Sequence, residues 1–281
     1  MSISLRITSI VILLLFSVSV LFNCAKEVSE DKILERNGLI YEINSDEPFT
    51  GRTIATYSDG QLEAVTEYKD GMRDGTKKTW YKNGLQEFVV EFTIGELNGT
   101  FKNWYENGQQ KAIMQFIDDK IDGTSKTWYE NGQQDMIAEY KDDEYHGTSK
   151  TWYENGQQNA ITQFIDGEYD GTEKTWYNNG QQKRIAEYKN GIENGTVETW
   201  YEDGQQKAIF QYKDGEYDGT LKIWYENGQQ KAITQFIDGK IDGTSKTWYE
   251  NGQQKEISVW VGNQKVELLE LYNSDGSTPR K

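Results

Sequence analysis

The stretch GTSKTWYENGQQ at residues 123–134 decides the fold of this chain, because it recurs unchanged at 147–158 and 243–254. Looser copies fill most of the sequence between and before these three. Self-similarity at a fixed period is typical of tandem-repeat proteins, in which one structural unit is stacked many times. The fold therefore follows from the structure of one unit and from the way that units join.

The repeat unit is 24 residues long and begins at a glycine that occurs nine times, from Gly51 to Gly243. Residues 51–266 hold these nine units without an insertion or deletion. We number the units 1 to 9 along the chain and the positions 1 to 24 from the glycine. Position 7 is Tyr and position 10 is Gly in every unit, and position 18 is always aromatic. Position 6 is tryptophan in eight units: Trp80, Trp104, Trp128, Trp152, Trp176, Trp200, Trp224 and Trp248.

Each unit has the sequence of a β-hairpin. Positions 2 to 7 are rich in threonine and aromatic residues, which favour strands. Asn-Gly at positions 9 and 10 of most units predicts a type I′ turn, in which both residues have positive φ. A second strand runs to position 18, and Asp-Gly or Asn-Gly at positions 20 and 21 predicts a second turn. Asp119 and Asp143 replace the second glycine, so this turn must accept a side chain there.

A single hairpin cannot bury two or three rings, so the units must stack. We therefore predict an all-β fold, an elongated array of nine tandem 24-residue hairpins that form a continuous antiparallel sheet. At roughly 4.8 Å between strands, the array is expected to be about 85 Å long. Positions 15 and 18 are an odd number apart, so they face opposite ways or a bulge lies between them.

The tryptophan row at position 6 is the candidate site, and it has two interpretations. It serves the packing of each unit against the next, which every unit needs. Alternatively, a single-layer sheet leaves the row exposed, where it binds sugars, lipids or an extended peptide.

The N-terminus has the pattern of an export signal. Arg6 precedes an apolar stretch that is too short to span a bilayer and fits a signal peptide over residues 1–23. Cys24, the only cysteine, follows directly and is predicted to carry a lipid. Residues 24–37 are predicted to be a lipidated N-terminus and tether. We expect an exported lipoprotein anchored in the membrane of the cell envelope.

Two segments flank the array. Asn37-Gly38-Leu39-Ile40-Tyr41 and Glu47-Pro48-Phe49-Thr50-Gly51 predict an N-terminal cap over residues 38–50. Residues 267–281 depart from the repeat, and we expect a C-terminal cap strand followed by a tail.

The pattern Gly-Thr-x-Lys-x-Trp-Tyr-x-Asn-Gly, followed by an aromatic residue and Asp-Gly, resembles the MORN-repeat superfamily. It is most similar to the bacterial MORN-2 or YwqK-type antitoxin repeats, over about residues 37–266. The resemblance implies an elongated β-hairpin array and little about activity.

Composition and motifs argue against several classes of function. The net charge of -16 disfavours nucleic acid as a partner. The sequence holds no Ser–His–acid set, no cluster of zinc ligands and no phosphate-binding loop, so we predict no catalytic residues, metal or cofactor. His146, the only histidine, is interpreted as a turn residue. Asp166, Glu168 and Asp170 could bind calcium weakly, but a solvated loop is the favoured interpretation.

Three hypotheses of function remain. The first is a non-enzymatic module that binds a protein partner or acts as a scaffold, with the membrane contacted through the lipid anchor only. The second is a glycan- or peptidoglycan-binding protein that uses the aromatic row. The third is an antitoxin-like inhibitor of a partner protein.

Overall fold

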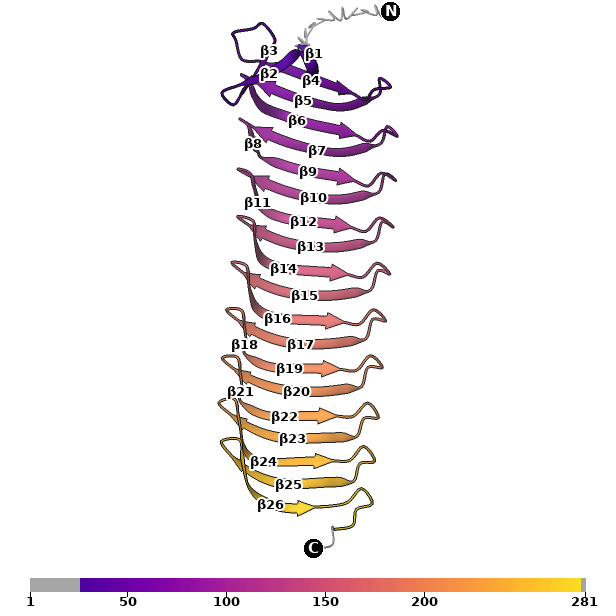
Figure 1. Ribbon diagram of the computed structural model, residues 1–281, viewed down its shortest axis with the longest axis vertical. Coiled ribbons are helices and arrows are strands. Elements are labelled where there is room, and N and C mark those ends of the chain that lie inside the picture. Colours follow the sequence, from indigo (N-terminus) through magenta and orange to yellow (C-terminus); the bar gives the residue numbers. More distant parts are fainter. Residues whose placement is uncertain (1–25, 279–281) are drawn as a thin grey trace, which may run out of the picture.

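All nine units fold as hairpins and stack into one long sheet (Figure 1). The computed structural model describes residues 26–278, so the predicted signal peptide and Cys24 lie outside the described residues. Pairing follows the chain from β4 to β26, with each strand antiparallel to its neighbours, and the main sheet has 24 strands. The predicted all-β array with a continuous antiparallel sheet is confirmed.

Each unit contributes two main strands. The first strands are β4 (Gly51–Thr56), β6 (Met72–Trp80), β9 (Gly99–Trp104), β12 (Gly123–Trp128), β14 (Glu144–Trp152), β16 (Glu168–Trp176), β19 (Gly195–Trp200), β22 (Gly219–Trp224) and β24 (Lys240–Trp248). The second strands are β5 (Leu62–Lys69), β7 (Gln86–Thr93), β10 (Gln110–Ile117), β13 (Gln134–Lys141), β15 (Gln158–Ile165), β17 (Gln182–Lys189), β20 (Gln206–Lys213), β23 (Gln230–Ile237) and β25 (Gln254–Val261). Short strands join some units: β8 (Glu96–Leu97), β11 (Lys120–Ile121), β18 (Ile192–Glu193) and β21 (Glu216–Tyr217).

The turn inside each hairpin differs from the predicted type I′ turn. In unit 4, the amide of Gly132 donates to the carbonyl of Tyr129, and the amide of Tyr129 donates to Gln133, both at 2.9 Å. Gly132 has φ 84°, whereas Asn131 is not among the residues with positive φ. The loop therefore has three residues and is closed by a glycine in the left-handed region. The prediction of type I′ at positions 9 and 10 is wrong.

The turn between units, and not the turn inside the hairpin, has the positive φ at both central residues that a type I′ turn requires. Asp166 and Gly167 have φ of 47° and 79°, and Asp142 and Asp143 have 51° and 70°. An aspartate at position 21 is accepted because its carboxylate caps the neighbouring unit: Oδ1 of Asp143 accepts the amide of Ile121 at 2.7 Å. This contact compensates for the left-handed backbone that glycine otherwise supplies.

The register gives the sheet two chemically different faces. In unit 4, Gly123 pairs with Tyr140 and Ser125 with Ala138, without a bulge along positions 14 to 18. Paired residues share a face and neighbours alternate, so positions 15 and 18 face opposite ways. Positions 1, 3, 5, 14, 16, 18 and 23 share one face, which we call the variable face. Positions 2, 4, 6, 12, 15 and 17 lie on the other, which we call the uniform face.

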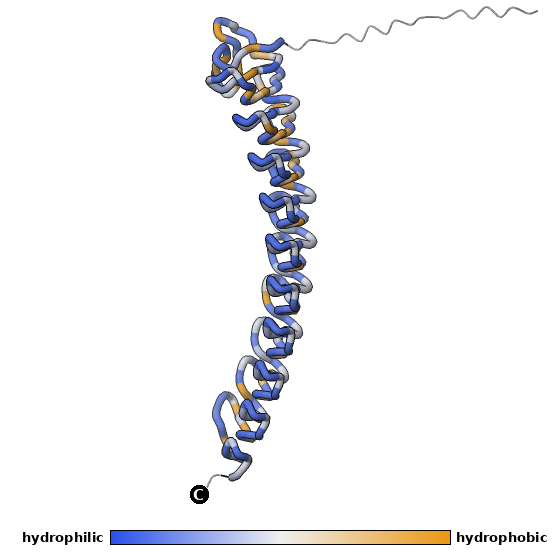
Figure 2. Tube along the Cα trace, turned by 90° about the vertical axis from the view of Figure 1, so that its right-hand side faces the viewer, coloured by the Kyte–Doolittle hydropathy of each residue, from blue (hydrophilic) through white to orange (hydrophobic). Residues whose placement is uncertain are grey.

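The core lies along the middle of the variable face, at positions 3 and 16. Ser125, Ala138 and Ala186 are at most 1% exposed, and Val197 is 3% exposed. The sheet has a single layer, so larger side chains of the same face must cover these small residues. The buried side chains of residues 26–278 thus form a narrow strip along the rod, whose elongated shape Figure 2 shows.

The N-terminal end of the sheet is closed by a small folded cap. β1 (Glu27–Ser29) pairs in parallel with β4, and after the 3-10 turn η1 (Glu30–Lys32) a hairpin forms from β2 (Ile33–Arg36) and β3 (Leu39–Glu42). The prediction of a tether is therefore wrong for the described residues 27–36. Apolar Ile33 and Leu34 lie half-buried among the charges, and Asn37-Gly38, with φ of 54° and 79°, turns the chain back.

The C-terminal end is open. β26 (Gln264–Leu271) pairs with β25 on one side, and all eight of its residues are exposed. After it, the chain repeats the turn of the units: the amide of Gly276 donates to the carbonyl of Asn273 at 2.9 Å. Counted from Glu267, Gly276 stands at position 10, so this segment follows the unit pattern although its sequence has diverged.

Candidate functional site

A column of tyrosine hydroxyls joins each unit to the next. The position-7 hydroxyl donates to the position-6 carbonyl of the following unit at 2.7 to 3.1 Å, and this bond occurs nine times. Burial is the main cause that raises the pKa of Tyr129, and a hydrogen bond with Asp135 adds to it and brings the pKa to about 12. The invariance of position 7 is explained by this contact, which sequence reasoning missed.

Two further polar side chains of the repeat form hydrogen bonds with backbone carbonyls. The side-chain amide nitrogen at position 9 donates to the position-8 carbonyl of the next unit. Asn131, for example, donates to the carbonyl of Glu154 at 2.9 Å. The position-12 amide fills the bulge beside the turn: Gln134 Nε2 donates to the carbonyls of Thr127 and Met136 at 2.6 and 2.8 Å. These recurrent residues hold the array together.

The tryptophan row lies at the turn end of the first strands, and each of its eight indoles is half-buried. Within residues 26–278, no close ring pair includes any of them. None of their indole nitrogens has a hydrogen-bond partner in the described part, and none is among the buried polar atoms that lack one. Their N–H groups therefore reach solvent once in each of units 2 to 9.

The rings that pair along the rod are at positions 18 and 23, on the variable face. Tyr140, Tyr145, Phe164, Tyr169 and Tyr188 follow one another with centroid distances of 4.6, 4.9, 4.8 and 5.0 Å. Position 23 escaped sequence reasoning because it is not consistently aromatic. Position 23 pairs with position 18 across the turn between units, as Tyr145 does with Tyr140. Placing the two positions opposite each other across that predicted turn would have identified position 23.

Differences between units concentrate on the variable face. Across the nine units, position 3 has seven residue types, and positions 16 and 23 have six each. Positions 2, 12 and 15 on the uniform face have two types each. The largest differences at the middle of the strands are therefore on one surface of the rod.

A charged cluster interrupts the variable face in unit 6. Arg184 at position 14 forms ion pairs with Glu173 at position 3 and Glu193 at position 23, and its Nη1 donates to the Tyr188 hydroxyl at 3.0 Å. All three charged side chains are partly buried, with exposed fractions of 16 to 27%. Glu193 stands where neighbouring units have tyrosine, so the ring column stops here.

An apolar groove lies on the variable face of units 2 and 3. It is an open depression of about 360 Å³ whose lining includes Phe88, Phe92, Phe101 and Phe116, with Arg73 and Lys77 at one end. The hydrophobic part of the trace in Figure 2 is densest in these units, next to the N-terminal cap. In the other units, positions 3 and 14 are filled mostly by small residues such as Ser and Ala.

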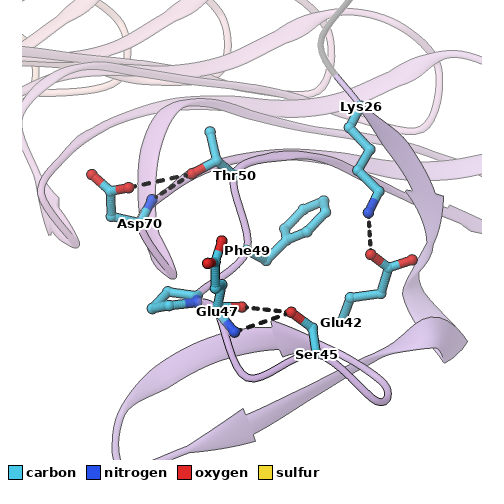
Figure 3. A pocket seen from close by; sticks show the side chains of 8 residues that line it. Lys26, Glu42, Ser45, Glu47, Phe49, Thr50 and Asp70 are labelled. Carbon is cyan, nitrogen blue, oxygen red and sulfur yellow. Dashed lines mark hydrogen bonds and ion pairs between the residues drawn. The ribbon is translucent and has the colours of Figure 1, made fainter.

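A second depression lies within the N-terminal cap and is polar (Figure 3). Lys26 pairs with Glu42 there. The hydroxyl of Thr50 accepts the amide of Asp70 at 2.9 Å, and Phe49 is buried against Tyr68. The polar groups are engaged with one another, so this pocket fastens the cap onto unit 1.

The remaining sequence candidates are exposed. Nδ1 of His146 lies 3.2 Å from Oδ1 of Asp166 on the surface. Within residues 26–278, no group of three or more His, Cys, Asp or Glu side chains is placed to hold a metal ion. The same residues contain no helix of the length and apolarity needed to cross a membrane.

These features define a class of protein first: an all-β tandem-repeat rod, held together by its repeated positions and most diverse along the middle of one face. The sequence profile described as "MORN repeat variant" matches seven consecutive stretches, residues 97–118, 121–142, 145–166, 169–190, 193–214, 217–238 and 241–259. The chain belongs to this MORN repeat variant family, whose repeats generally serve as non-enzymatic binding or scaffold modules.

Comparison with other proteins adds little about function. No curated protein matches the chain. The crystal structure of TcdB2-TccC3 is 10% identical, with a TM-score of 0.20 over 85% of this chain and 17% of that chain. For TcdB2-TccC3-Cdc42 the values are 10%, 0.15, 85% and 16%. The chain spans less than a fifth of those proteins, and similarity at this level carries no argument.

Proposed function

We propose that this protein is an exported, membrane-anchored lipoprotein whose rod binds a protein partner through the variable face. The concentration of unit-to-unit differences at positions 3, 16 and 23 of that face carries the proposal. A uniform surface offers the same groups at every unit and cannot fix where along the rod a partner sits. Side chains that differ from unit to unit can fix that register, because a shift of one unit would mismatch charges and rings.

The proposed binding face is tested by replacing its unit-specific residues with the residues that other units have at the same positions. In one variant Lys77→Ser, Phe88→Ala and Phe101→Ser give units 2 and 3 the residues found at these positions elsewhere. In a second variant Glu173→Ser, Arg184→Ala and Glu193→Tyr do the same for unit 6. Both sets use residues that the array already accommodates, so the fold should persist, which circular dichroism checks.

Each variant and the wild-type full chain are used to capture proteins from envelope extracts. A protein captured by the wild type should be lost with at least one of the two variants. Lys78→Gln and Lys174→Gln, at position 4 on the uniform face, are the matched controls and should retain it. Loss with these controls alone would place binding on the other face and contradict the proposal.

The anchor is proposed at Cys24, which follows the apolar N-terminal segment directly. Acylation there would put the capped end of the rod nearest the membrane and the β26 end farthest away. Metabolic labelling with a fatty-acid analogue should mark the wild type but not Cys24→Ser. Label retained by the variant would exclude this cysteine as the acceptor.

The solvent-facing indole N–H groups favour glycan binding as the second candidate function. One donor in each of eight consecutive units suits a polymer that itself repeats, such as a linear glycan strand. Under this alternative, soluble peptidoglycan fragments should shift tryptophan emission equally in the wild type and in both uniform variants. Emission unchanged at saturating fragment would eliminate the alternative.

A further inference from the structure

Lysine recurs at position 4 of the uniform face although the fold gives its side chain no contact. We call these seven exposed residues the lysine ladder: Lys78, Lys102, Lys126, Lys150, Lys174, Lys222 and Lys246. Within residues 26–278 their ammonium groups form no hydrogen bond, ion pair or cation–π contact. The recurrent residues at positions 7, 9 and 12, in contrast, each bond to a backbone carbonyl. The stability of the array therefore does not explain the lysines.

The register places the lysine ladder in one row with apolar residues between the lysines. Lys126 pairs with Ile137 of its own unit, and Ile137 pairs with Lys150 of the next unit. The strands cross the rod in the same orientation from β4 to β26 (Figure 1). Consecutive lysines therefore stand about 10 Å apart, which is two strand spacings. Units 2 to 6 carry five lysines in succession, and these span about 40 Å along the rod.

The tryptophan row runs beside the lysine ladder on the same face, two residues further along each first strand. In unit 4, Lys126 is exposed, while Trp128 and Ile137 are half-buried. Such a unit offers a ligand one ammonium group, one indole with a free N–H and one apolar side chain. Sugars carry hydroxyls and carboxylates on their ring edges and C–H groups on their ring faces. A linear acidic polysaccharide can therefore use all three groups in every unit that it crosses.

Carboxylates line both edges of the sheet and leave the lysine ladder between them. Position 8, in the turn inside the hairpin, is glutamate in six units, and position 20, in the turn between units, is aspartate in six. On the uniform face itself position 17 is glutamate in four units. Three of these glutamates, Glu67, Glu91 and Glu139, accept the amide of position 2 in the next unit.

This distribution of charge selects a narrow ligand with widely spaced anionic groups. A broad anionic surface, such as a membrane, would meet both acidic edges together with the ladder. Duplex nucleic acid would be repelled strongly as well, because it carries a charge about every 1.7 Å along its axis. A single polymer strand can lie between the edges, and salt screens the carboxylates that are farther away than about 8 Å.

We propose that the lysine ladder and the tryptophan row bind a linear acidic polysaccharide that lies along the rod. A glycan with one carboxylate in every second sugar has a charge period close to the spacing of the lysines. One exposed ion pair contributes little, but successive pairs along one polymer reinforce one another because the polymer is already held nearby. The site lies on the face opposite to the proposed protein-binding face, so each proposal can fail while the other stands.

The test measures fluorescence anisotropy of an end-labelled hyaluronan oligosaccharide of eight disaccharides, titrated with the full chain in nanodiscs of neutral lipid. Lys78→Gln combined with Lys102→Gln should weaken binding at least fivefold and reduce its dependence on salt. Glu198→Lys fills the gap in the ladder between Lys174 and Lys222, and it should strengthen binding at least twofold.

The matched control is Arg73→Gln combined with Lys77→Gln, which removes the same charge from the variable face nearby. It should leave affinity within twofold, and circular dichroism should show an unchanged fold for every variant. Equal weakening by this control, or no gain with Glu198→Lys, would overturn the inference. Equal binding of the same oligosaccharide with its carboxylates reduced to alcohols would also overturn it. So would ladder-dependent binding of phosphatidylglycerol vesicles while the oligosaccharide does not bind, because the ladder would then serve a membrane surface.

Discussion

Asparagine at position 9 shows how one residue can have a role other than the one its motif indicates. Asn-Gly favours a type I′ turn because both residues accept positive φ. Here the side chain is what matters: Asn131 Oδ1 accepts the amide of Gln133, and Nδ2 donates to the next unit. Asp203, which stands at position 9 of unit 7, keeps only the first of these contacts. The turn type could not be predicted from Asn-Gly alone, because this dipeptide fits both a type I′ turn and the three-residue loop that is observed.

The tyrosine column can be tested at a single position. Tyr153→Phe removes the hydroxyl that donates to the Trp176 carbonyl at 2.8 Å. It should lower the free energy of unfolding by about 0.5 to 1.5 kcal/mol, measured by urea denaturation. Tyr169→Phe is the control, because its hydroxyl has no such partner in the described residues, and the change should stay within about 0.5 kcal/mol. Equal losses would show that the hydroxyl contact is not what stabilises the array.

The Tyr129 hydroxyl of this column predicts sensitivity to alkali. A raised pKa means that folding favours the protonated tyrosine, so its contribution is present below the ordinary pKa of 10.0 and is lost as pH rises. For Tyr129 the loss should extend from about pH 10 to about 12. Urea denaturation at increasing pH should show the decline, and it should be smaller in Tyr129→Phe. A variant that declines as steeply as the wild type would contradict the assignment.

The tryptophan row makes a third prediction at the residue scale. A fully buried tryptophan costs about 3 to 5 kcal/mol when truncated, and a half-buried one roughly 2 kcal/mol. Trp152→Ala should therefore lower the unfolding midpoint, while Lys150→Ala on the same face should not. If Trp152→Ala melts with the wild type, the row is a binding surface, and the glycan candidate moves ahead of the protein partner.

At the scale of the element, the hairpin and its period could be predicted because every unit repeats the same strand and turn residues. The cap strands β1 and β2 could not, because they occur once and their apolar residues are scattered among charges. The apolar groove was also missed. Phe88 and Phe101 look like isolated departures from a consensus, and only the register shows that they lie on adjacent strands of one face.

Whole units should be removable, whereas half units should not. Deleting residues 147–170 would bring unit 4 onto unit 6, where the Tyr129 hydroxyl meets the Trp176 carbonyl as it now meets that of Trp152. The shorter protein should fold, because contacts reach only neighbouring units. Deleting residues 147–158 removes one strand of a hairpin and should be severely destabilising, as seen by circular dichroism. Equal tolerance of both deletions would argue against independent stacking.

The direction of the strands has a mechanical consequence for the whole molecule. The strands run across the rod, so the hydrogen bonds between them run along its length (Figure 1). A pulling force on the two ends would load the bonds of one unit at a time and would not shear the bonds of many units together. Single-molecule stretching should give a series of low, similar force peaks, each releasing about 80 Å of chain. A rod built in this way should therefore lengthen under load in steps of one unit.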